Sequence, residues 1–365
     1  MDTIVGSAPD KTVIHKNHSK VKSAMHMQYP ISPPQFQQHL IDWQRAHGRH
    51  DLPWQQNPSP YRVLVSEVML QQTQVVTVIP YFERWMTSFP TIEALASATE
   101  DEVMNHWQGL GYYSRARNLR KAAQYIMAHH QGQFPESLAA LLDIPGVGRY
   151  TAGAIRSFAY DRYGPIVDGN VKRLFCRFFA LDGVPGTSAV DKQLWQLAET
   201  FTPETDNRVF AQGLLDIGAT ICKPKNPNCE HCCFQKTCLA FKYDRVQTLP
   251  TPKPKKTIPT KAGQFLWVES DNKILLEKRA SDGIWGALWC LPQIHLQPEQ
   301  FGEHMQLKGT FKHTFTHYKL DANVWMIDRL GVMEPQLQWV EKSKVFNLGL
   351  PTPIKKFLTR HLEGC

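Results

Sequence analysis

A change of residue pattern at residues 246–261 divides the chain into two parts that cannot share one architecture. This stretch contains four prolines and four lysines, a composition typical of a stiff, extended and basic linker. Before it, apolar residues recur at helical spacing, as in Phe36, Leu40 and Trp43. Short Gly or Pro turns separate these helical stretches. The sequence therefore predicts a mostly helical domain over residues 34–245.

The part after the linker, residues 262–365, has a different pattern. Its apolar residues form short runs bounded by polar or turn-forming residues, which is typical of β-strands. The strand-like runs are 265–268, 273–277 and 323–327. The tail from 345 to 358 has helical spacing. We therefore expect a small α/β domain.

Charge and hydropathy limit the partners of the chain. The formal net charge is +8, which favours a polyanionic partner such as nucleic acid. No apolar run reaches the roughly 18 to 20 residues needed to span a bilayer, so we expect no membrane contact and a cytoplasmic, nucleoid-associated location in a bacterial cell. Residues 1–33 show no apolar period and end in a proline-rich stretch, which predicts a disordered arm.

Four of the eight cysteines fall at a spacing that points to a bound metal. Cys222, Cys229, Cys232 and Cys238 follow the pattern C-x6-C-x2-C-x5-C. Clustered cysteines in a large cytosolic chain favour metal ligation over disulfides. The spacing suits either zinc or an iron-sulfur cluster, and Cys233 could replace Cys232.

A glycine turn and a nearby carboxylate form a second notable stretch. Gly146 and Gly148 lie in Pro-Gly-Val-Gly, directly before a helical segment. Such a turn lets backbone amides at a helix start approach a phosphate, although it can also be an ordinary turn. Asp168 follows an apolar pair and precedes Gly-Asn, where a short turn can hold a carboxylate against a ligand.

Two further stretches carry candidate chemistry. Glu67 has Val63 and Leu64 one helical turn before it, so it is either partly desolvated, as a general acid requires, or an ordinary exposed glutamate. The stretch 107–117 combines glycines, paired tyrosines and two arginines. It is either an aromatic wedge with phosphate-binding cations or a packed helix-helix turn.

Taken together, these stretches resemble the MutY-type adenine DNA glycosylases of the helix-hairpin-helix glycosylase superfamily. The resemblance runs from about Gln35 to the C-terminus. The stretches that carry it are the four cysteines and SEVMLQQTQV, GLGYYSRARNL, PGVGRYTAGAI, VDGNVKR, WGALWCLPQ and HTFTHY. It implies a helical glycosylase domain with one four-iron four-sulfur (4Fe-4S) cluster at the cysteines, followed by a Nudix-like domain that inspects 8-oxoguanine.

The resemblance also implies a reaction and its catalytic residues. The family removes adenine mispaired with 8-oxoguanine or guanine in double-stranded DNA during base excision repair. Glu67 matches the acid that protonates the flipped adenine at N7. Asp168 matches the carboxylate that stabilises the oxocarbenium sugar. Asn170 would orient Asp168, and Tyr150 would lie beside the reacting sugar.

Further residues match positions that contact DNA. Gln212 matches a residue that contacts the adenine, and Gln72 and Tyr112 match residues inserted around 8-oxoguanine, with Leu70 and Thr73 nearby. Residues Phe315, Thr316 and His317 match the lesion-reading motif. The family commonly has Phe-Ser-His there, so Thr316 adds a methyl group to the expected hydroxyl.

Two departures sharpen the functional hypothesis. Tyr150 occupies the place where the bifunctional endonuclease III relatives have a lysine, which predicts a monofunctional glycosylase. No Nudix catalytic box follows Trp285, so the second domain should read nucleotides without hydrolysing them. The rival interpretations are a related T:G mismatch glycosylase and a noncatalytic iron-sulfur protein that binds DNA or senses redox state. We expect a monomer; contacts with a sliding clamp or mismatch-repair protein remain open.

Overall fold

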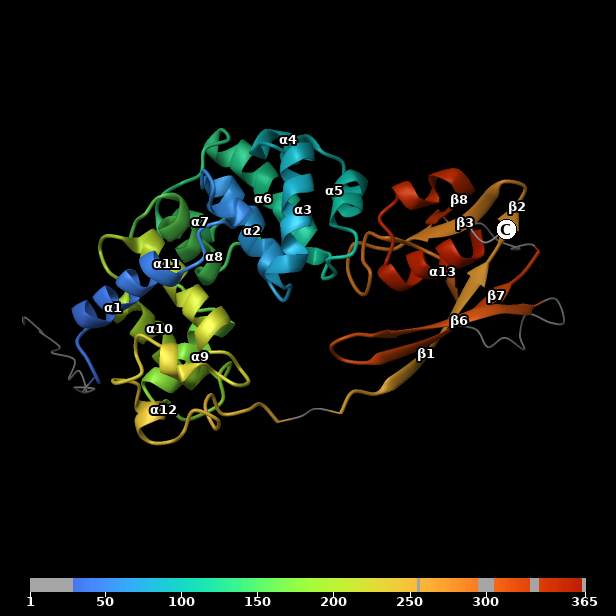
Figure 1. Ribbon diagram of the computed structural model, residues 1–365. Helices are drawn as coiled ribbons and strands as arrows, with labels where there is room; N and C mark the ends of the chain where they lie inside the picture. Colours follow the sequence, from blue (N-terminus) through green and yellow to red (C-terminus); the bar gives the residue numbers. More distant parts are fainter. Residues whose placement is uncertain (1–28, 255–256, 295–304, 329–334, 363–365) are drawn as a thin grey trace, which may run out of the picture.

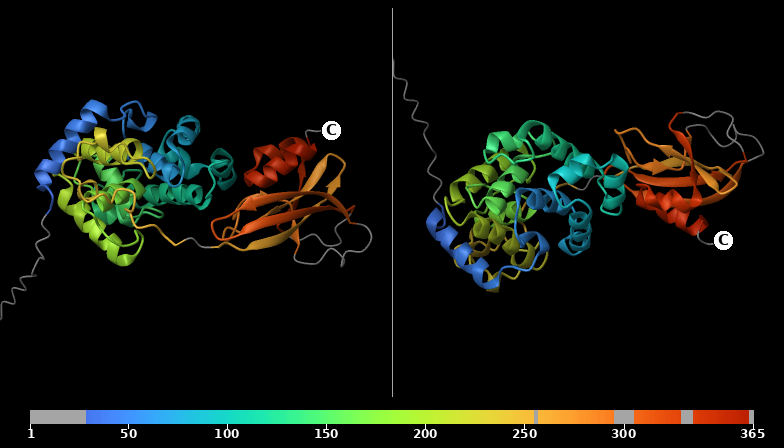
Figure 2. Two further views of the ribbon diagram at one scale, coloured as in Figure 1. Left: turned by 60° about the horizontal axis from the view of Figure 1, so that its bottom comes forward. Right: turned by 90° about the horizontal axis from the view of Figure 1, so that it is seen from above.

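The computed structural model describes residues 29–254, 257–294, 305–328 and 335–362. A helical domain comes first along the chain, and an α/β domain follows it (Figure 1). The two domains lie side by side, and the α/β domain approaches the helical domain near helix α5 (Figures 1 and 2).

The helical domain contains α-helices interspersed with short 3-10 and π-helical segments. In the described part of the chain, no helix is long and apolar enough to cross a bilayer. The elements are α1 (Pro33–His47), η1 (Pro53–Gln55), α2 (Pro60–Leu70), α3 (Val75–Ser88), α4 (Ile92–Ser97), α5 (Glu100–Trp107), α6 (Ser114–His130), α7 (Leu138–Leu142), α8 (Arg149–Ala154), η2 (Ile155–Ala159), α9 (Gly169–Phe178), α10 (Ser188–Phe201), α11 (Asn207–Asp216), η3 (Ile217–Ile221), η4 (Cys229–His231) and α12 (Leu239–Lys242).

These helices form two lobes (Figure 1). In one lobe α2 packs against α3 and α6, and α6 packs against α4 and α5. In the other, α1 packs against α10 and α11, and α9 packs against α10, α11 and α12. Segment η2 contacts both α2 and α11. The lobes therefore meet where α2 faces the α8–η2 and α11 segments.

Local sequence signals explain where the helices near this junction begin. The Ser32 side chain caps α1 and forms a reciprocal capping box with Gln35. The Ser59 hydroxyl accepts a hydrogen bond from the backbone N–H of Arg62, and Pro60 supplies a preset backbone angle at the first position of α2. Asp168 caps α9 through the backbone N–H of Val171. Each cap fixes the direction in which the following helix enters the core.

The second domain consists of two small sheets with one flanking helix. Its elements are β1 (Thr260–Trp267), β2 (Glu269–Ser270), β3 (Lys273–Lys278), β4 (Trp289–Cys290), β5 (Gln293–Ile294), β6 (Gln306–Thr314), β7 (Lys319–Met326), β8 (Leu337–Glu341), η6 (Lys342–Asn347) and α13 (Thr352–Leu362). The first sheet has the order β5-β1-β7-β6, with β1 and β7 parallel. The second has the order β2-β3-β4, with β8 paired to β3. Helix α13 packs against β6.

The predicted boundaries of the arm and the linker need correction. Tyr29 is in edge contact with Phe201, with ring centroids 5.0 Å apart, so the ordered fold begins before residue 33 because an aromatic ring can be buried there. Leu249 is 2% exposed and packs on the helical domain. At the other end, Thr260 already belongs to β1. Residues 1–28 lie outside the described part of the chain.

The predicted helix at 345–358 is also wrong in part. Residues up to Asn347 form the 3-10 segment η6, and α13 begins only at Thr352. Pro351 separates the two elements, and a proline disfavours helical geometry in the residue before it. Periodicity alone did not reveal this break.

Contacts between side chains and backbone join the two domains. The Gln108 side chain donates to the carbonyl oxygen of Leu350 at 3.4 Å, and the Tyr113 hydroxyl donates to the same oxygen at 3.2 Å. Lys278 forms an ion pair with Asp101 at 2.6 Å. The α5–α6 turn of the helical domain is thereby bound to the α/β domain.

A cluster of aromatic rings connects α1 to the cysteine segment. Phe36 is fully buried and stacks on Phe234, with ring centroids 4.3 Å apart and planes 9° from parallel. It also makes edge contacts with Phe178 and Phe201. Stacked and edge-to-face pairs add to the stabilisation from burial. Phe36 therefore ties three segments that are distant in the sequence.

Replacing Phe36 with alanine should lower the free energy of unfolding of the helical domain by about 3 to 5 kcal/mol, because it removes a fully buried ring and leaves a cavity. Urea unfolding followed by far-ultraviolet ellipticity would measure this loss. Phe241→Ala is the matched control, since Phe241 is 45% exposed. A loss below about 1 kcal/mol in Phe36→Ala would contradict the central role of this ring.

Candidate active site

Two hollows meet at the junction of the lobes. The first, which we call the Glu67 cavity, has a volume of about 250 Å³. Its lining includes the apolar side chain of Trp54 and the polar side chains of Glu67 and Gln212. The second, the Asp168 groove, has a volume of about 650 Å³ and is lined largely by polar residues, including Tyr150 and Asp168. Glu67 lines both hollows. The two hollows therefore adjoin at the Glu67 carboxyl group.

Helix α2 carries Glu67 on a buried face. Its side chain is 5% exposed, and its Oε2 accepts a hydrogen bond from the Tyr150 hydroxyl at 2.5 Å. Loss of solvation raises the pKa of Glu67 to about 7; the Tyr150 hydrogen bond acts in the opposite direction and the nearby Asp168 raises it further. Glu67 therefore holds a proton in part of its population at neutral pH.

Asp168 is held rigidly at the start of α9. Its Oδ1 accepts from the backbone N–H of Val171 at 2.7 Å, and its Oδ2 accepts from the Asn170 side chain at 2.9 Å. Burial raises the pKa of Asp168, whereas these hydrogen bonds favour its charged form. These hydrogen bonds fix the orientation of the Asp168 carboxylate on the wall of the groove, and the Asn170 side chain makes one of them.

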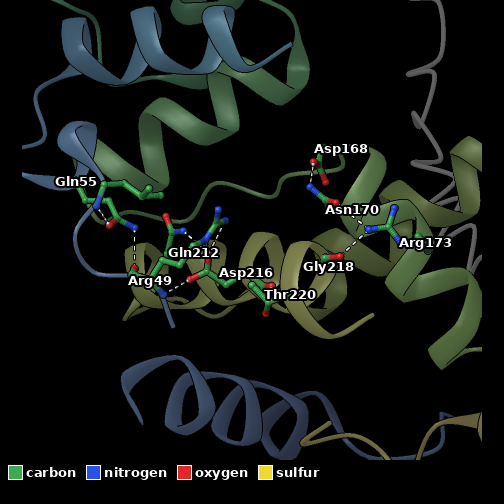
Figure 3. A network of polar contacts seen from close by, with 10 residues as sticks. Arg49, Gln55, Asp168, Asn170, Arg173, Gln212, Asp216, Gly218 and Thr220 are labelled. Atoms are coloured by element: carbon green, nitrogen blue, oxygen red, sulfur yellow. Dashed lines mark hydrogen bonds and ion pairs between the residues drawn. The ribbon is translucent and has the colours of Figure 1, made fainter. Parts of the chain in front are cut away.

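Arg173 extends this arrangement toward the cysteine segment (Figure 3). It donates to the Asn170 Oδ1 at 2.9 Å and to the carbonyl oxygen of Gly218 at 2.7 Å. Its Nε donates to the carbonyl oxygen of Cys222 at 2.6 Å. The orientation of Asn170 is therefore linked to the backbone on which the first cysteine lies.

Gln212 lies on α11 and lines the Glu67 cavity. Its side-chain amide donates to Asp216 Oδ1 at 2.8 Å, one helical turn later (Figure 3). Asp216 also accepts from Arg49, which is in the loop that precedes η1. The sequence interpretation named Gln212 but missed both partners. The i, i+4 spacing of Gln212 and Asp216 was the available signal.

Gln72 and Tyr112 lie in turns where their backbone φ angles are positive. Gln72 has φ 58° and Tyr112 has φ 49°, conformations that residues other than glycine rarely adopt. Gln72 and Thr73 line the Asp168 groove, and Leu70 lines both hollows. Tyr112 is 46% exposed.

Arg115 explains how these two turns are held. Its guanidinium donates to the carbonyl oxygens of Met69, Gln71 and Gly111 at 3.0, 2.6 and 3.0 Å. Arg115 is only 7% exposed, so it is not the phosphate-binding cation considered from the sequence. Arg117 likewise donates to the carbonyl oxygen of Gly286 in the second domain.

The glycine turn lies directly before α8. Gly146 has φ 78°, and a Cβ there would approach the Cβ of Asn118 to 2.7 Å, so both backbone angle and space favour glycine. Gly148 precedes α8, and a Cβ there would meet open space. The turn is therefore free to face a partner at the start of α8, the helix that carries Tyr150.

A third hollow of about 590 Å³ lies between the domains. The helical domain contributes Tyr112, and the β6–β7 turn contributes Phe315, Thr316 and His317. Trp285 lies 5.4 Å from Phe315 between ring centroids. Aromatic rings and exposed polar groups thus line a space bounded by both domains.

The four predicted cysteine ligands line one small cavity. Cys222, Cys229, Cys232 and Cys238 contribute to it together with Arg177, and Cys233 does not. Arg177 is 3% exposed and donates to the Cys222 sulfur at 3.4 Å. In the described residues, no group of three or more His, Cys, Asp or Glu side chains is placed to hold a metal ion.

The two domains match two different protein families. Residues 65–200 match the family described as HhH-GPD superfamily base excision DNA repair protein. Residues 264–360 match the NUDIX domain family. The prediction of a helix-hairpin-helix glycosylase domain followed by a Nudix-like α/β domain is confirmed.

Relatives align over most of the chain. An adenine DNA glycosylase from Buchnera aphidicola subsp. Baizongia pistaciae is 37% identical over 339 residues, which cover 89% of this chain and 96% of the relative. An adenine DNA glycosylase from Rattus norvegicus is 33% identical, covering 88% of this chain and 77% of the relative. The chain belongs to the adenine DNA glycosylase family. This adenine DNA glycosylase is a DNA N-glycosylase of base excision repair.

Solved structures resemble the helical part of the glycosylase. A thermostable thymine-DNA glycosylase has a TM-score of 0.52 at 28% identity and covers 58% of this chain, with 97% of its own length matched. An endonuclease III in a non-covalent DNA complex has a TM-score of 0.50 at 21% identity, covering 59% of this chain and 98% of its own. The second similarity shows the shared fold.

Tyr150→Phe should shift the pH dependence of base release upward in the glycosylase. The Tyr150 hydroxyl stabilises the charged form of Glu67, so its removal raises the pKa of Glu67 further. We propose that Glu67 donates its proton during base release, so the single-turnover rate should fall as the pH rises through the pKa of Glu67, about 7. In the variant this fall should occur at a pH about one unit higher. Tyr163→Phe is the control, because that hydroxyl bonds the distant Glu199 backbone. A midpoint displaced to lower pH would contradict this assignment.

Proposed function

We propose that this adenine DNA glycosylase removes adenine paired with 8-oxoguanine or guanine in double-stranded DNA, acts as a monomer, and leaves an abasic site without efficient strand cleavage. One observation carries the proposal. Glu67, a carboxyl group that retains a proton near neutral pH, lies where the apolar cavity meets the groove that contains Asp168. The cavity suits a flipped base and the groove suits its sugar.

The first chemical step uses Glu67 as a general acid. Its proton passes to N7 of the adenine in the cavity. The bond between N9 and the sugar C1′ then breaks, and its electron pair leaves with the adenine. Protonation converts a poor leaving group into a good one, and a general acid with pKa near the working pH is most effective.

The second step uses Asp168. Loss of the base leaves positive charge on the sugar, and a carboxylate in a partly desolvated wall stabilises that charge strongly. Asp168 can also bond transiently to C1′, as in retaining glycosidases. Water then attacks C1′, displaces Asp168 and transfers a proton to the Glu67 carboxylate. Asn170 holds Asp168 in position through the hydrogen bond at 2.9 Å.

Tyr150 supports the absence of efficient strand cleavage. Its hydroxyl is already used to hydrogen-bond Glu67, and burial beside two carboxyl groups raises its pKa well above the ordinary value. A phenol of this kind does not form the imine with the sugar that an amine would. Tyr150 therefore orients the acid.

The hollow between the domains supports recognition of the opposite base. The turn residues Phe315, Thr316 and His317 face it together with Tyr112 from the helical domain. Aromatic rings can stack on a base, and the Thr316 hydroxyl can donate to or accept from its edge. The extra methyl of Thr316, relative to serine, leaves that hydroxyl in place.

We further propose that Cys222, Cys229, Cys232 and Cys238 hold one 4Fe-4S cluster. Four thiolates could hold either zinc or an iron-sulfur cluster, and the four cysteines line one small cavity. Membership of the adenine DNA glycosylase family supports the cluster. Arg177 beside Cys222 supplies positive charge suited to thiolates. When bound, the cluster supplies a covalent cross-link between the segments that follow η3.

A panel of duplexes containing A:8-oxoguanine, A:G and T:G pairs tests the reaction. Adenine should be released from the first two, and the strand should break only after alkali treatment. Glu67→Gln should lower the single-turnover rate by about 10³-fold, because it removes the proton donor, while gel-shift binding to the lesion duplex persists.

Glu93→Gln is the control for this substitution, since Glu93 lies on α4, outside both hollows. Release of thymine from T:G without release of adenine would favour a thymine mismatch glycosylase. Binding without release from any duplex would favour a noncatalytic DNA-binding protein.

Anaerobically purified protein should absorb in the violet and contain about four irons per chain. Cys232→Ser should lose the band and the iron, whereas Cys233→Ser should keep both, because only Cys232 lines the cavity. Colourless protein containing zinc would refute the cluster assignment.

A further inference from the structure

We propose that Asp216 is a positioning residue that sets the preference for adenine by fixing which end of the Gln212 amide faces the Glu67 cavity. The inference rests on the proposed function, since it requires the adenine to occupy that cavity. Asp216 itself does not line the cavity, so it acts through Gln212.

Asp216 is fully buried and satisfied by three hydrogen bonds (Figure 3). Its Oδ1 accepts from the Gln212 Nε2 at 2.8 Å and from the Arg49 Nε at 2.7 Å. Its Oδ2 accepts from the backbone N–H of Arg49 at 2.9 Å. The Arg49 guanidinium also forms an ion pair with it at 2.7 Å.

This environment selects one orientation of the Gln212 amide. A carboxylate can only accept hydrogen bonds, so the NH₂ end of Gln212 must face Asp216. The carbonyl end, Oε1, does not bond to Asp216. It therefore remains as an acceptor on a side chain that lines the cavity. Turning the amide over would place two acceptors against each other in a buried site, which is unfavourable because neither can donate to the other.

An acceptor at this position favours one class of purine. Adenine carries an exocyclic amino group, which donates hydrogen bonds, at the carbon where guanine and hypoxanthine carry a carbonyl oxygen. The Gln212 Oε1 can accept from the amino group, whereas it would repel a carbonyl oxygen. A buried polar group left unpaired by the wrong base penalises that base strongly. Asp216 therefore excludes 6-oxopurines by holding Gln212 still.

Asp216 also holds the opposite wall of the cavity. Through Arg49 it fixes the loop before η1, and the side chain of Gln55, the last residue of η1, donates to the Arg49 carbonyl oxygen at 3.0 Å. Trp54 in η1 is 8% exposed and lines the cavity. Asp216 therefore holds both the loop next to Trp54, which would stack on the base, and the Gln212 amide, which would hydrogen-bond the edge of the base.

The backbone around Asp216 is suited to this role. Asp216 ends α11, and the chain continues directly as the π-helical segment η3. The Thr220 hydroxyl donates to the Asp216 carbonyl oxygen at 2.8 Å, and Arg173 donates to that of Gly218. π-helical turns are rare and frequently lie at functional sites.

The test compares two bases that differ only at the 6 position. Single-turnover release of adenine and of unsubstituted purine is measured from duplexes in which each lies opposite 8-oxoguanine. Purine has no amino group to contact Gln212. Asp216→Asn, which lets the amide of residue 212 turn over, should lower the adenine-to-purine rate ratio about tenfold and raise the relative release of hypoxanthine.

A merely structural role predicts a different result, because loss of folded enzyme lowers both rates and leaves the ratio unchanged. That outcome overturns the proposal. Asp191→Asn is the matched control. Asp191 lies on α10, outside the Glu67 cavity, and forms an ion pair with Lys172 at 2.8 Å. Its substitution should not change the ratio.

Two further variants keep the test decisive if Asp216→Asn folds poorly. Gln212→Leu has neither a donor for Asp216 nor an acceptor for the base, so the ratio should fall; an unchanged ratio overturns the proposal. In a Gln212→Leu background, Asp216→Asn should lower the ratio no further, and an additional fall would show that Asp216 does not act through Gln212. Wild-type enzyme that released no adenine would instead refute the proposed function.

Discussion

Withdrawal of one carboxyl group from water is the constraint on which the site depends. Glu67 is 5% exposed between two lobes, and a carboxylate in such a place is costly unless it gains a proton or partners. Tyr150 supplies one hydrogen bond, and Asp168 opposes ionisation. Neither lobe alone provides this environment, because α2 carries Glu67 while the α8 and α9 segments carry its neighbours. The raised pKa of Glu67 therefore depends on segments that are distant from α2 in the sequence.

Buried charged side chains hold the loops that frame this group. Arg115 binds carbonyl oxygens of two turns, Asp216 binds the Arg49 loop and Gln212, and Arg177 binds the backbone at Lys223 and Leu249. Burial of such groups is unfavourable unless their hydrogen bonds are made. Each binds at least one segment distant in the sequence, so each favours one arrangement of irregular backbone. The α/β domain is joined by the same kind of contact.

Much of the architecture could be predicted from pattern. The proline and lysine stretch marked the change from helices to strands. The predicted strand 265–268 overlaps β1, and the predicted strand 273–277 falls within β3. The helical tail was placed wrongly because periodicity does not register the effect of Pro351. Asp216 was missed because its sequence neighbours resemble any buried helix. Arg115 looked like a surface cation because nothing local shows that 110–111 and 69–71 lie beside it.

The sequence by itself determined the two-domain order, the turns and caps, the four cysteines and the residue types available for acid and nucleophilic chemistry. These depend on local backbone preferences and on short spacings, which act within a few residues. The tertiary structure alone decided that Glu67 meets Tyr150 and Asp168 from about a hundred residues away, and that the side-chain amide of Gln212 donates to the buried Asp216. Desolvation and hydrogen-bond orientation depend on every segment that surrounds a group, and only the folded chain brings those segments together.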